Sequence, residues 1–143
     1  MTSIDFYFNA EDRLAIACRL AGKAWEQKNR VLVYAPQPEI AQKIDRMLWT
    51  WHAISFVPHC YADDVLAAET PVLIAAGDGN APPCEVLLNL AADCPPFFER
   101  HERLLEVVSQ DEEERRAGRA RYAFYRDRGY PIRNHDLAGE GRE

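Results

Sequence analysis

One short, wholly apolar segment, Val31–Ala35 (VLVYA), constrains the fold of this chain more than any other feature. It follows a segment from Glu11 to Lys28 whose apolar residues recur every three or four positions, a spacing typical of an amphipathic helix. Continuous apolar runs of this length occur in strands that are covered on both faces, as in parallel sheets with helices on either side. The chain is therefore expected to be an α/β protein.

The alternation of strand and helix continues on both sides of this pair. Ile4 to Phe8 alternates and is rich in aromatic residues, which indicates a first strand, and Asn9 and Asp12 are candidate caps of the helix that follows. Pro38 opens a second helix. The remaining predicted elements are four short strands and a last helix: Ser55–Val57, Val72–Ala76, Val86–Leu90, Leu104–Val108 and Glu112–Arg128.

This order of elements predicts a single-domain, three-layer α/β sandwich whose sheet is mostly parallel or mixed and is flanked by helices. The domain is expected to span residues 1–133. Residues 134–143 contain two glycines and no periodic apolar pattern, so they are expected to form a flexible C-terminal tail.

Length and charge exclude several classes of protein. The longest apolar runs of this 143-residue chain are far shorter than the roughly 20 residues of a membrane span. The N-terminus lacks the basic start and apolar stretch of a secretory signal, so a cytosolic protein is expected. The formal net charge of −6 argues against nonspecific binding to nucleic-acid phosphates.

The net charge is unevenly distributed along the chain. Residues 1–114 carry a net charge of −10, residues 115–133 carry +6 through seven arginines and one aspartate, and residues 134–143 carry −2. A basic segment on an acidic body indicates an electropositive site for one anionic partner.

The sequence shows no convincing catalytic, metal or cofactor site. The Gly77-Asp78-Gly79-Asn80 segment is followed by Ala81-Pro82-Pro83, which prevents a phosphate-binding helix from starting there, so a surface turn is expected. Cys18, Cys60, Cys84 and Cys94 form no C-x-x-C pair and are expected to be reduced thiols. His59 and Cys60 are adjacent in a strand and would point to opposite faces, which argues against a nucleophile pair.

The last predicted helix contains the most informative pattern. At 100° per residue, Arg115, Arg119, Tyr122 and Arg126 lie within about 60° of one another, opposite Ala117, Ala120 and Phe124. The alanines and Phe124 are expected to pack, which leaves an Arg/Tyr stripe exposed. Guanidinium groups bind carboxylates bidentately, so the stripe suits a short acidic peptide. The alternative is a solvated basic helix that balances Asp111–Glu114 at its N-terminal end.

A second candidate surface lies where the second helix gives way to a strand. Trp49, Phe56 and Pro58 belong to an aromatic segment, Met47–His59, and Pro58 would end any interior strand pairing. These side chains belong either to the core or to an interface with a partner protein.

Taken in order, six segments of the chain resemble the chi subunit of bacterial DNA polymerase III, an accessory protein of the clamp loader. They are D-F-Y-F near the N-terminus, K-N-R-V-L-V-Y-A, D-R-M-L-W, S-F-V-P-H, E-V-V and the R-Y-x-x-Y-R pattern of the last helix. Together they span nearly the whole chain, and S-F-V-P-H with R-Y-x-x-Y-R is the most specific pair.

The resemblance implies a noncatalytic bridging role in DNA replication. Proteins of this family have a fold like that of mononucleotide-binding domains but bind no nucleotide with it. They bind the psi subunit, which connects them to the clamp loader, and the acidic C-terminal tail of single-stranded-DNA-binding protein, which ends in Pro-Phe. Contact with DNA is then only indirect, in the bacterial cytoplasm at the replisome on the nucleoid, with no membrane involved.

The family's sites map onto residues of this chain. Arg115, Arg119, Tyr122 and Arg126 match the tail-binding helix, and Trp49, Phe56 and Pro58 match the psi-binding patch. The chain departs from the family in a short segment between Val108 and Arg115 with four consecutive acids, Asp111–Glu114. It also has Ala123 where a third basic residue is expected, which leaves Arg126 and Arg121 as substitutes. The rival interpretation is a non-replicative adaptor for another acidic partner.

Overall fold

The computed structural model describes residues 1–50, 58–76 and 82–140 and contains one sheet of seven strands. The strands are β1 (Ser3–Ala10), β2 (Val31–Tyr34), β3 (His59–Tyr61), β4 (Val72–Ala75), β5 (Val86–Asn89), β6 (Arg103–Ser109) and β7 (Ile132–Asp136). The helices are α1 (Arg13–Glu26), α2 (Pro38–Thr50), α3 (Glu112–Asp127) and the short α4 (Leu137–Glu140), with two 3-10 turns, η1 (Ala67–Glu69) and η2 (Phe98–Arg100).

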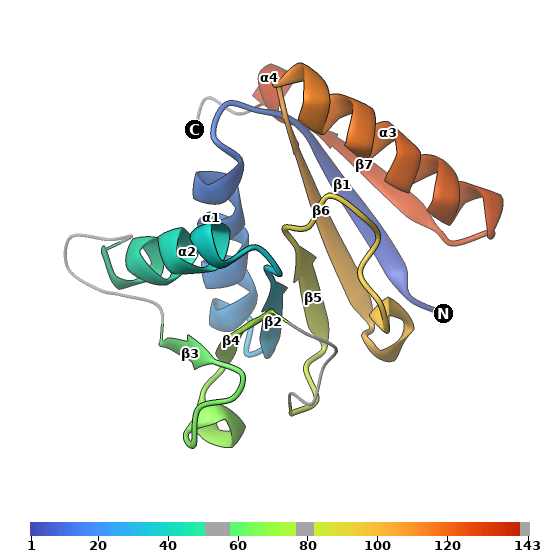
Figure 1. Cartoon of the computed structure of the whole chain (residues 1–143). Helices are drawn as coiled ribbons and strands as arrows, with labels where there is room; N and C mark the ends of the chain where they lie inside the picture. Colours follow the sequence, from blue (N-terminus) through green and yellow to red (C-terminus); the bar gives the residue numbers. More distant parts are fainter. Residues whose placement is uncertain (51–57, 77–81, 141–143) are drawn as a thin grey trace.

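The strands lie in the order β3-β4-β2-β5-β6-β1-β7, and every pairing in the described part of the chain is parallel. The helices α1, α2 and α3 connect β1 to β2, β2 to β3 and β6 to β7, which are not neighbours in the sheet. The neighbouring pairs β3–β4 and β5–β6 are connected by segments that contain the 3-10 turns η1 and η2. α1 and α2 cover one face of the sheet and α3 covers the other, as Figure 1 shows. The expectation of a three-layer α/β sandwich is confirmed.

Two hydrophobic cores fill the spaces between the three layers. The larger core lies under α1 and α2 and includes Cys18, Ile44 and Leu48 from the helices. The smaller core lies under α3 and includes Phe6, Leu104 and Tyr125. Alternate residues of each central strand enter the two cores, which explains why Val31–Tyr34 and Val72–Ala75 are apolar throughout.

The start of α1 is set by Asp12 rather than by Asn9. The Asp12 side chain accepts hydrogen bonds from the backbone amides of Leu14 and Ala15, at 3.1 and 3.2 Å. Asn9 instead has a φ of 64°, at the irregularity where the β1–β6 pairing shifts register. Asparagine tolerates this left-handed conformation better than most residues.

The C-terminal segment differs from the sequence-based expectation. Instead of forming a flexible tail from residue 134, residues 132–136 form β7 and pair with β1 at the edge of the sheet. The weak apolar pattern of β7 hides this strand, because it is held largely by backbone pairing and by polar side chains that bind Asp5. The predicted strand Ser55–Val57 lies outside the described residues.

Candidate functional site

The candidate site is built around α3, whose start and end follow from local sequence. The Asp111 side chain accepts a hydrogen bond from the Glu114 amide at 3.2 Å, and three glutamates lie in the first turn, where carboxylates complement the helix dipole. The helix ends before Gly129, whose φ of 82° suits glycine. Much of the acidic run that precedes the arginines therefore stabilises the helix terminus.

The face of α3 that packs on the sheet differs from the predicted one. Gly118, Arg121 and Tyr125 are buried, whereas Ala117 and Phe124 are half-buried and Ala120 is exposed. These two alanines and Phe124 line an open groove of about 620 Å³ beside residues 92–99. The apolar pattern pointed to the wrong face because the residues that pack include an arginine and a glycine.

A buried polar cluster explains the orientation of α3. Glu106 of β6 is fully buried and accepts hydrogen bonds from Arg121 Nε at 2.8 Å, Tyr125 Oη at 2.6 Å and Asn89 Nδ2 at 3.0 Å. Arg121 also donates to the Ala92 carbonyl at 2.8 Å. Burial, together with Glu106, raises the pKa of Tyr125 well above its usual value, so its hydroxyl stays a donor.

Arg121 therefore cannot replace the third basic residue of a peptide site, because only 4% of its side chain is exposed. The periodicity of apolar residues did not predict this cluster. The available signal was a single carboxylate, Glu106, in the otherwise apolar strand L-L-E-V-V, which requires a buried cationic or hydrogen-bonding partner.

Next to the buried face of α3, a groove of about 360 Å³ opens between the helix and the sheet. Its lining comes from α3 and from the carboxyl ends of three strands: Phe8, Asn9, Val108, Ser109, Arg115, Arg119 and Asp136. In parallel α/β sheets the carboxyl ends of the strands are the usual place for a binding site. The groove combines two guanidinium groups with an apolar wall, and this combination suits the end of a peptide that carries a carboxylate and an apolar side chain.

The four predicted residues of the Arg/Tyr stripe take three different places. Arg115 and Arg119 line the groove. Tyr122 is half-buried against Phe6 and Phe8, with ring centroids 5.0 and 6.2 Å apart, and its hydroxyl accepts a hydrogen bond from Asn134 Nδ2 at 3.3 Å. Arg126 does not line the groove; it is exposed and pairs with Asp127 at 3.3 Å.

Nothing in the local sequence pattern marks Phe8 and Val108 as site residues. Each lies at the end of a predicted strand, and only the parallel pairing of β1 with β6 places them beside Arg115 and Arg119. Glu112 forms an exposed ion pair with Arg119, its carboxylate lying 3.6 Å from Arg119 Nη2. Such a pair contributes little to stability, and another anion can readily replace Glu112 beside Arg119.

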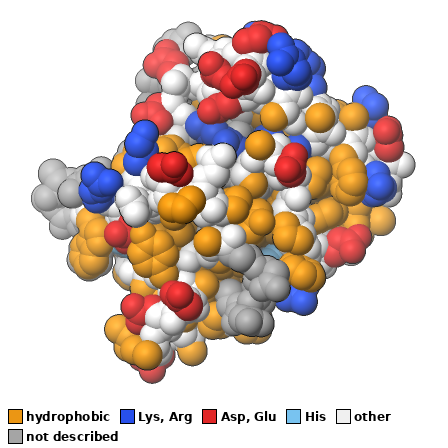
Figure 2. Space-filling view, in the orientation of Figure 1, with side chains coloured by type: hydrophobic (Ala, Val, Ile, Leu, Met, Phe, Trp, Pro, Cys, Tyr) orange, Lys and Arg blue, Asp and Glu red, His pale blue; other side chains and the backbone are white. Residues whose placement is uncertain are grey.

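The second predicted surface lies at the opposite edge of the sheet, near β3. Trp49 at the end of α2 is 54% exposed, and its ring packs edge-on against His59 at 5.1 Å. Pro58 is half-buried, and Phe56 lies outside the described residues. Exposed apolar side chains of Tyr61, Val65 and Leu66 follow along the chain, and Figure 2 shows hydrophobic atoms gathered over this end of the molecule.

The remaining candidates are the cysteines, His59 and the glycine turn. All four cysteines are free, and burial raises the pKa of Cys18 to about 12 and that of Cys84 to about 11. His59 is buried and bonds to Asp45 at 3.0 Å, while Cys60 packs into the core on the other face. Residues 77–81, with the glycine turn, lie outside the described residues. Among the described residues, no cluster of three or more potential metal ligands occurs, and no helix has the length and apolar character of a membrane span.

Comparison with known proteins gives one family over most of the chain. A profile of the DNA polymerase III chi subunit, HolC, matches residues 1–133. The chain belongs to the DNA polymerase III chi subunit family. The chi subunit of Pseudomonas aeruginosa is 34% identical over 141 residues, which cover 96% of this chain and 98% of that protein. The chi subunits of Haemophilus influenzae and Escherichia coli are 29% and 27% identical over 118 residues, covering 82% of this chain and 82% and 80% of those proteins.

Membership of the chi family makes this chain a subunit for DNA replication, with protein partners in the replisome. It points to an accessory subunit rather than to a catalytic one. The rival interpretation, an adaptor outside replication, has no support from these relatives.

Proposed function

We propose that this chi-family protein bridges the clamp loader, through the psi subunit, to the acidic C-terminal tail of single-stranded-DNA-binding protein. The observation that carries the proposal is the groove between α3 and the sheet, in which Arg115 and Arg119 stand beside the apolar side chains of Phe8 and Val108. A replication subunit of this kind acts in the bacterial cytoplasm, at the replisome, and reaches DNA only through a protein already bound there.

Arg115 and Arg119 are one helical turn apart, so their guanidinium groups project from the same side of α3 into the groove. In the proposed complex they bind the terminal carboxylate of the tail and an acidic side chain before it. Charge-assisted bonds to guanidinium groups are the stronger kind of hydrogen bond, and their planar donors match a carboxylate.

The last side chain of the tail, a phenylalanine, occupies the apolar part of the groove against Phe8 and Val108. Aromatic rings prefer tilted or offset contacts with one another, and Phe8 already makes such a contact with Tyr122. Tyr122 does not line the groove. It acts as a positioning residue that fixes the Phe8 ring from behind, while Arg126 contributes only long-range positive charge.

Glu112 competes with the tail for Arg119, because the two side chains form an exposed ion pair at 3.6 Å. Binding of the tail exchanges this pair for a new one, which lowers the net gain. The groove is therefore expected to bind more tightly when Glu112 is neutral, and binding should weaken as salt rises because exposed pairs are screened.

Fluorescence anisotropy with a labelled acidic peptide that ends in Pro-Phe tests this assignment. Arg119→Gln should weaken binding about tenfold or more, Glu112→Gln should strengthen it severalfold, and an amidated peptide should bind more weakly than the free acid. Arg116→Gln, at an exposed α3 position outside the groove, is the control for charge. Equal affinity of Arg119→Gln and Arg116→Gln would remove the groove as the tail site.

The psi-binding surface is proposed around Trp49 and Pro58, at the opposite edge of the sheet. Phe56, which the resemblance assigns to the same surface, lies outside the described residues. β3 is one edge strand and β7 the other, so partners at the two surfaces do not compete for space. Co-purification with psi should be lost in Trp49→Ala or Phe56→Ala and kept in Arg119→Gln, with the reverse result for the tail peptide. Loss of both partners in one folded variant would contradict two independent surfaces.

A further inference from the structure

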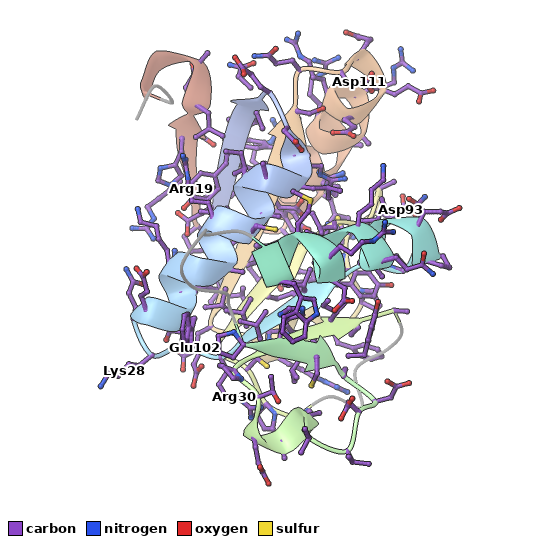
Figure 3. All side chains as sticks on the ribbon, turned by 90° about the vertical axis from the view of Figure 1, so that its left-hand side faces the viewer. Arg19, Lys28, Arg30, Asp93, Glu102 and Asp111 are labelled. Carbon is purple, nitrogen blue, oxygen red and sulfur yellow. The ribbon has the colours of Figure 1, made fainter. Side chains whose placement is uncertain are left out.

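A basic pocket of about 500 Å³ lies on the face of the sheet opposite α3, between α1 and strands β1, β6 and β7. The residues that line it are Tyr7, Arg19, Leu20, Lys23, Ala24, Gln27, Arg103, Leu105, His135 and Leu137. Figure 3 views the molecule from this side and shows Arg19 on the exposed flank of α1. Neither the proposed tail site nor the psi surface uses these residues.

The register of the sheet places the polar groups of this pocket together. Asp5 of β1 is buried and bonds to Arg103 Nη2 at 3.1 Å, Arg133 Nε at 3.0 Å and His135 Nε2 at 3.0 Å. Tyr7, two residues further along β1, stacks on the His135 ring at 4.4 Å. One carboxylate thus serves two arginines and a histidine.

The positive charge in and beside the pocket exceeds the negative charge. Arg19 and Lys23 add two cations from α1, and neither forms an ion pair with another described residue. Burial and Asp5 raise the pKa of Tyr7, while Arg103, Arg133 and Arg19 oppose the rise.

Arg103 has unused hydrogen-bonding capacity. Its Nε is buried and has no acceptor among the described residues, although its Nη2 binds Asp5. A buried donor without a partner costs free energy, and a bound anion that shifts the guanidinium would recover it. The protein as a whole is acidic, with a net charge of −6, so a local cluster of cations indicates a site for an anion.

We propose that this basic pocket binds a compact phosphorylated ligand of nucleotide size. The pocket lies under the second half of α1, on a face of the sheet, and not in the crevice at the carboxyl ends of the strands where mononucleotide-binding folds hold a nucleotide. The cations converge from α1 and from the sheet, and the single carboxylate of Asp5 does not balance their charge. A phosphate offers more negative charge and more acceptor oxygens than a carboxylate does. Leu20, Leu105 and Leu137 supply apolar walls for the rest of the ligand. The volume lies within the usual range for small-molecule sites.

A strand of nucleic acid fits this pocket less well than a compact ligand. Binding along a strand needs a track of basic and aromatic side chains over several nucleotides. Here the cations surround one hollow, and the exposed Glu26 and Glu102 flank the lining residues Lys23, Gln27 and Arg103 in sequence.

Calorimetric titration and thermal melting with pyrophosphate, ADP and adenosine test the proposal. Pyrophosphate and ADP should bind and raise Tm, whereas adenosine should do neither, because only ligand that binds the native state stabilises it. Arg19→Gln with Lys23→Gln should weaken both phosphates at least about tenfold. Lys28→Gln with Lys43→Gln removes the same charge from exposed positions outside the pocket and should bind like wild type.

The same variants define the contrary results. Equal binding by the two double variants, or no binding of either phosphate to wild type, would overturn the proposal. Tighter binding of oligothymidylate or of an acidic peptide than of ADP would also overturn it, in favour of a polymer partner. The double variant Arg19→Gln with Lys23→Gln should bind the tail peptide with wild-type affinity. A failure of the basic-pocket proposal is therefore distinguishable from a failure of the proposed tail site on α3.

Discussion

Glu106 and Arg121 form the ionic contact that most directly determines how α3 sits on the sheet. Both side chains are almost completely buried, and every partner of the carboxylate lies within 3.0 Å. A buried pair of this kind gives only weak evidence for net stability, but removal of one partner leaves an uncompensated charge. The cluster therefore specifies one orientation of α3 more than it adds to the free energy of folding.

Replacement of Arg121 by methionine should be strongly destabilising. The Arg121→Met variant leaves Glu106 buried without its cation, which typically costs about 3–5 kcal/mol. Urea unfolding at neutral pH measures the loss, with Arg116→Met as the exposed control on the same helix. A loss below about 1 kcal/mol would mean that the network is dispensable.

At the scale of elements, close contact between α3 and β6 depends on a residue without a side chain. A Cβ atom at Gly118 would lie 2.7 Å from Val108 Cγ2 and 3.1 Å from Val108 Cγ1. Val108 also lines the groove that holds Arg115 and Arg119. The spacing between helix and strand, and with it the shape of the proposed tail site, is therefore set at this contact.

Gly118→Ala should destabilise the protein, although alanine normally favours a helix by about 1 kcal/mol. Overpacking against Val108 costs about 1–3 kcal/mol, so a net loss of up to about 2 kcal/mol is expected. Tail-peptide affinity should fall as well. The double variant Gly118→Ala with Val108→Ala should lose less unfolding free energy than the sum of the losses in the two single variants. A Gly118→Ala variant more stable than wild type would contradict the close contact.

The attachment of β7 should depend on pH through Asp5. Burial alone raises the pKa of Asp5, but hydrogen bonds from His135, Arg103 and Arg133 outweigh it and hold the pKa below its usual value. The unfolded chain therefore binds more protons, and the contribution is present above the unfolded pKa of about 3.9 and is lost as pH falls through the lowered pKa.

The difference in unfolding free energy between wild type and Asp5→Asn isolates this contribution, because the other carboxylates titrate in both proteins. The difference should be fully present at pH 5 and should shrink towards pH 2.5. Urea titrations over this range measure it. A gap that stays constant to pH 2.5 would show that Asp5 does not stabilise β7 through its charge.

At the scale of the whole molecule, one sheet joins all the described elements. The two hydrophobic cores lie on opposite faces of the same strands, so neither can lose its packing while the other stays intact. Single domains of this size usually unfold in one cooperative step. The proposed partners would then attach to opposite edges of one rigid body.

Urea unfolding followed by far-UV circular dichroism and by tryptophan fluorescence should give coincident midpoints. Of the described tryptophans, Trp25 lies in α1 and Trp49 in α2, whereas circular dichroism also detects α3 and the far strands. Two separate midpoints would show that the α3 side of the molecule unfolds independently.

The sequence by itself determined the α/β class, most of the helices and strands, and the chi family. Apolar periodicity reports burial directly, and the ordered motifs along the chain are specific enough for the family. The sequence also predicted that Arg115 and Arg119 lie on one side of the last helix, because charge and helical spacing are local properties.

Only the tertiary structure decided which face of α3 is buried, that residues 132–136 complete the sheet, and that Phe8 and Val108 form the wall beside the arginines. Each of these depends on groups far apart in the chain. Glu106 binds Arg121 and Tyr125, and Asp5 binds Arg133 and His135, between residues 15 to 130 positions apart in sequence. A buried charge can turn a polar helix face inward, and no periodicity of apolar residues along the chain records such a pairing.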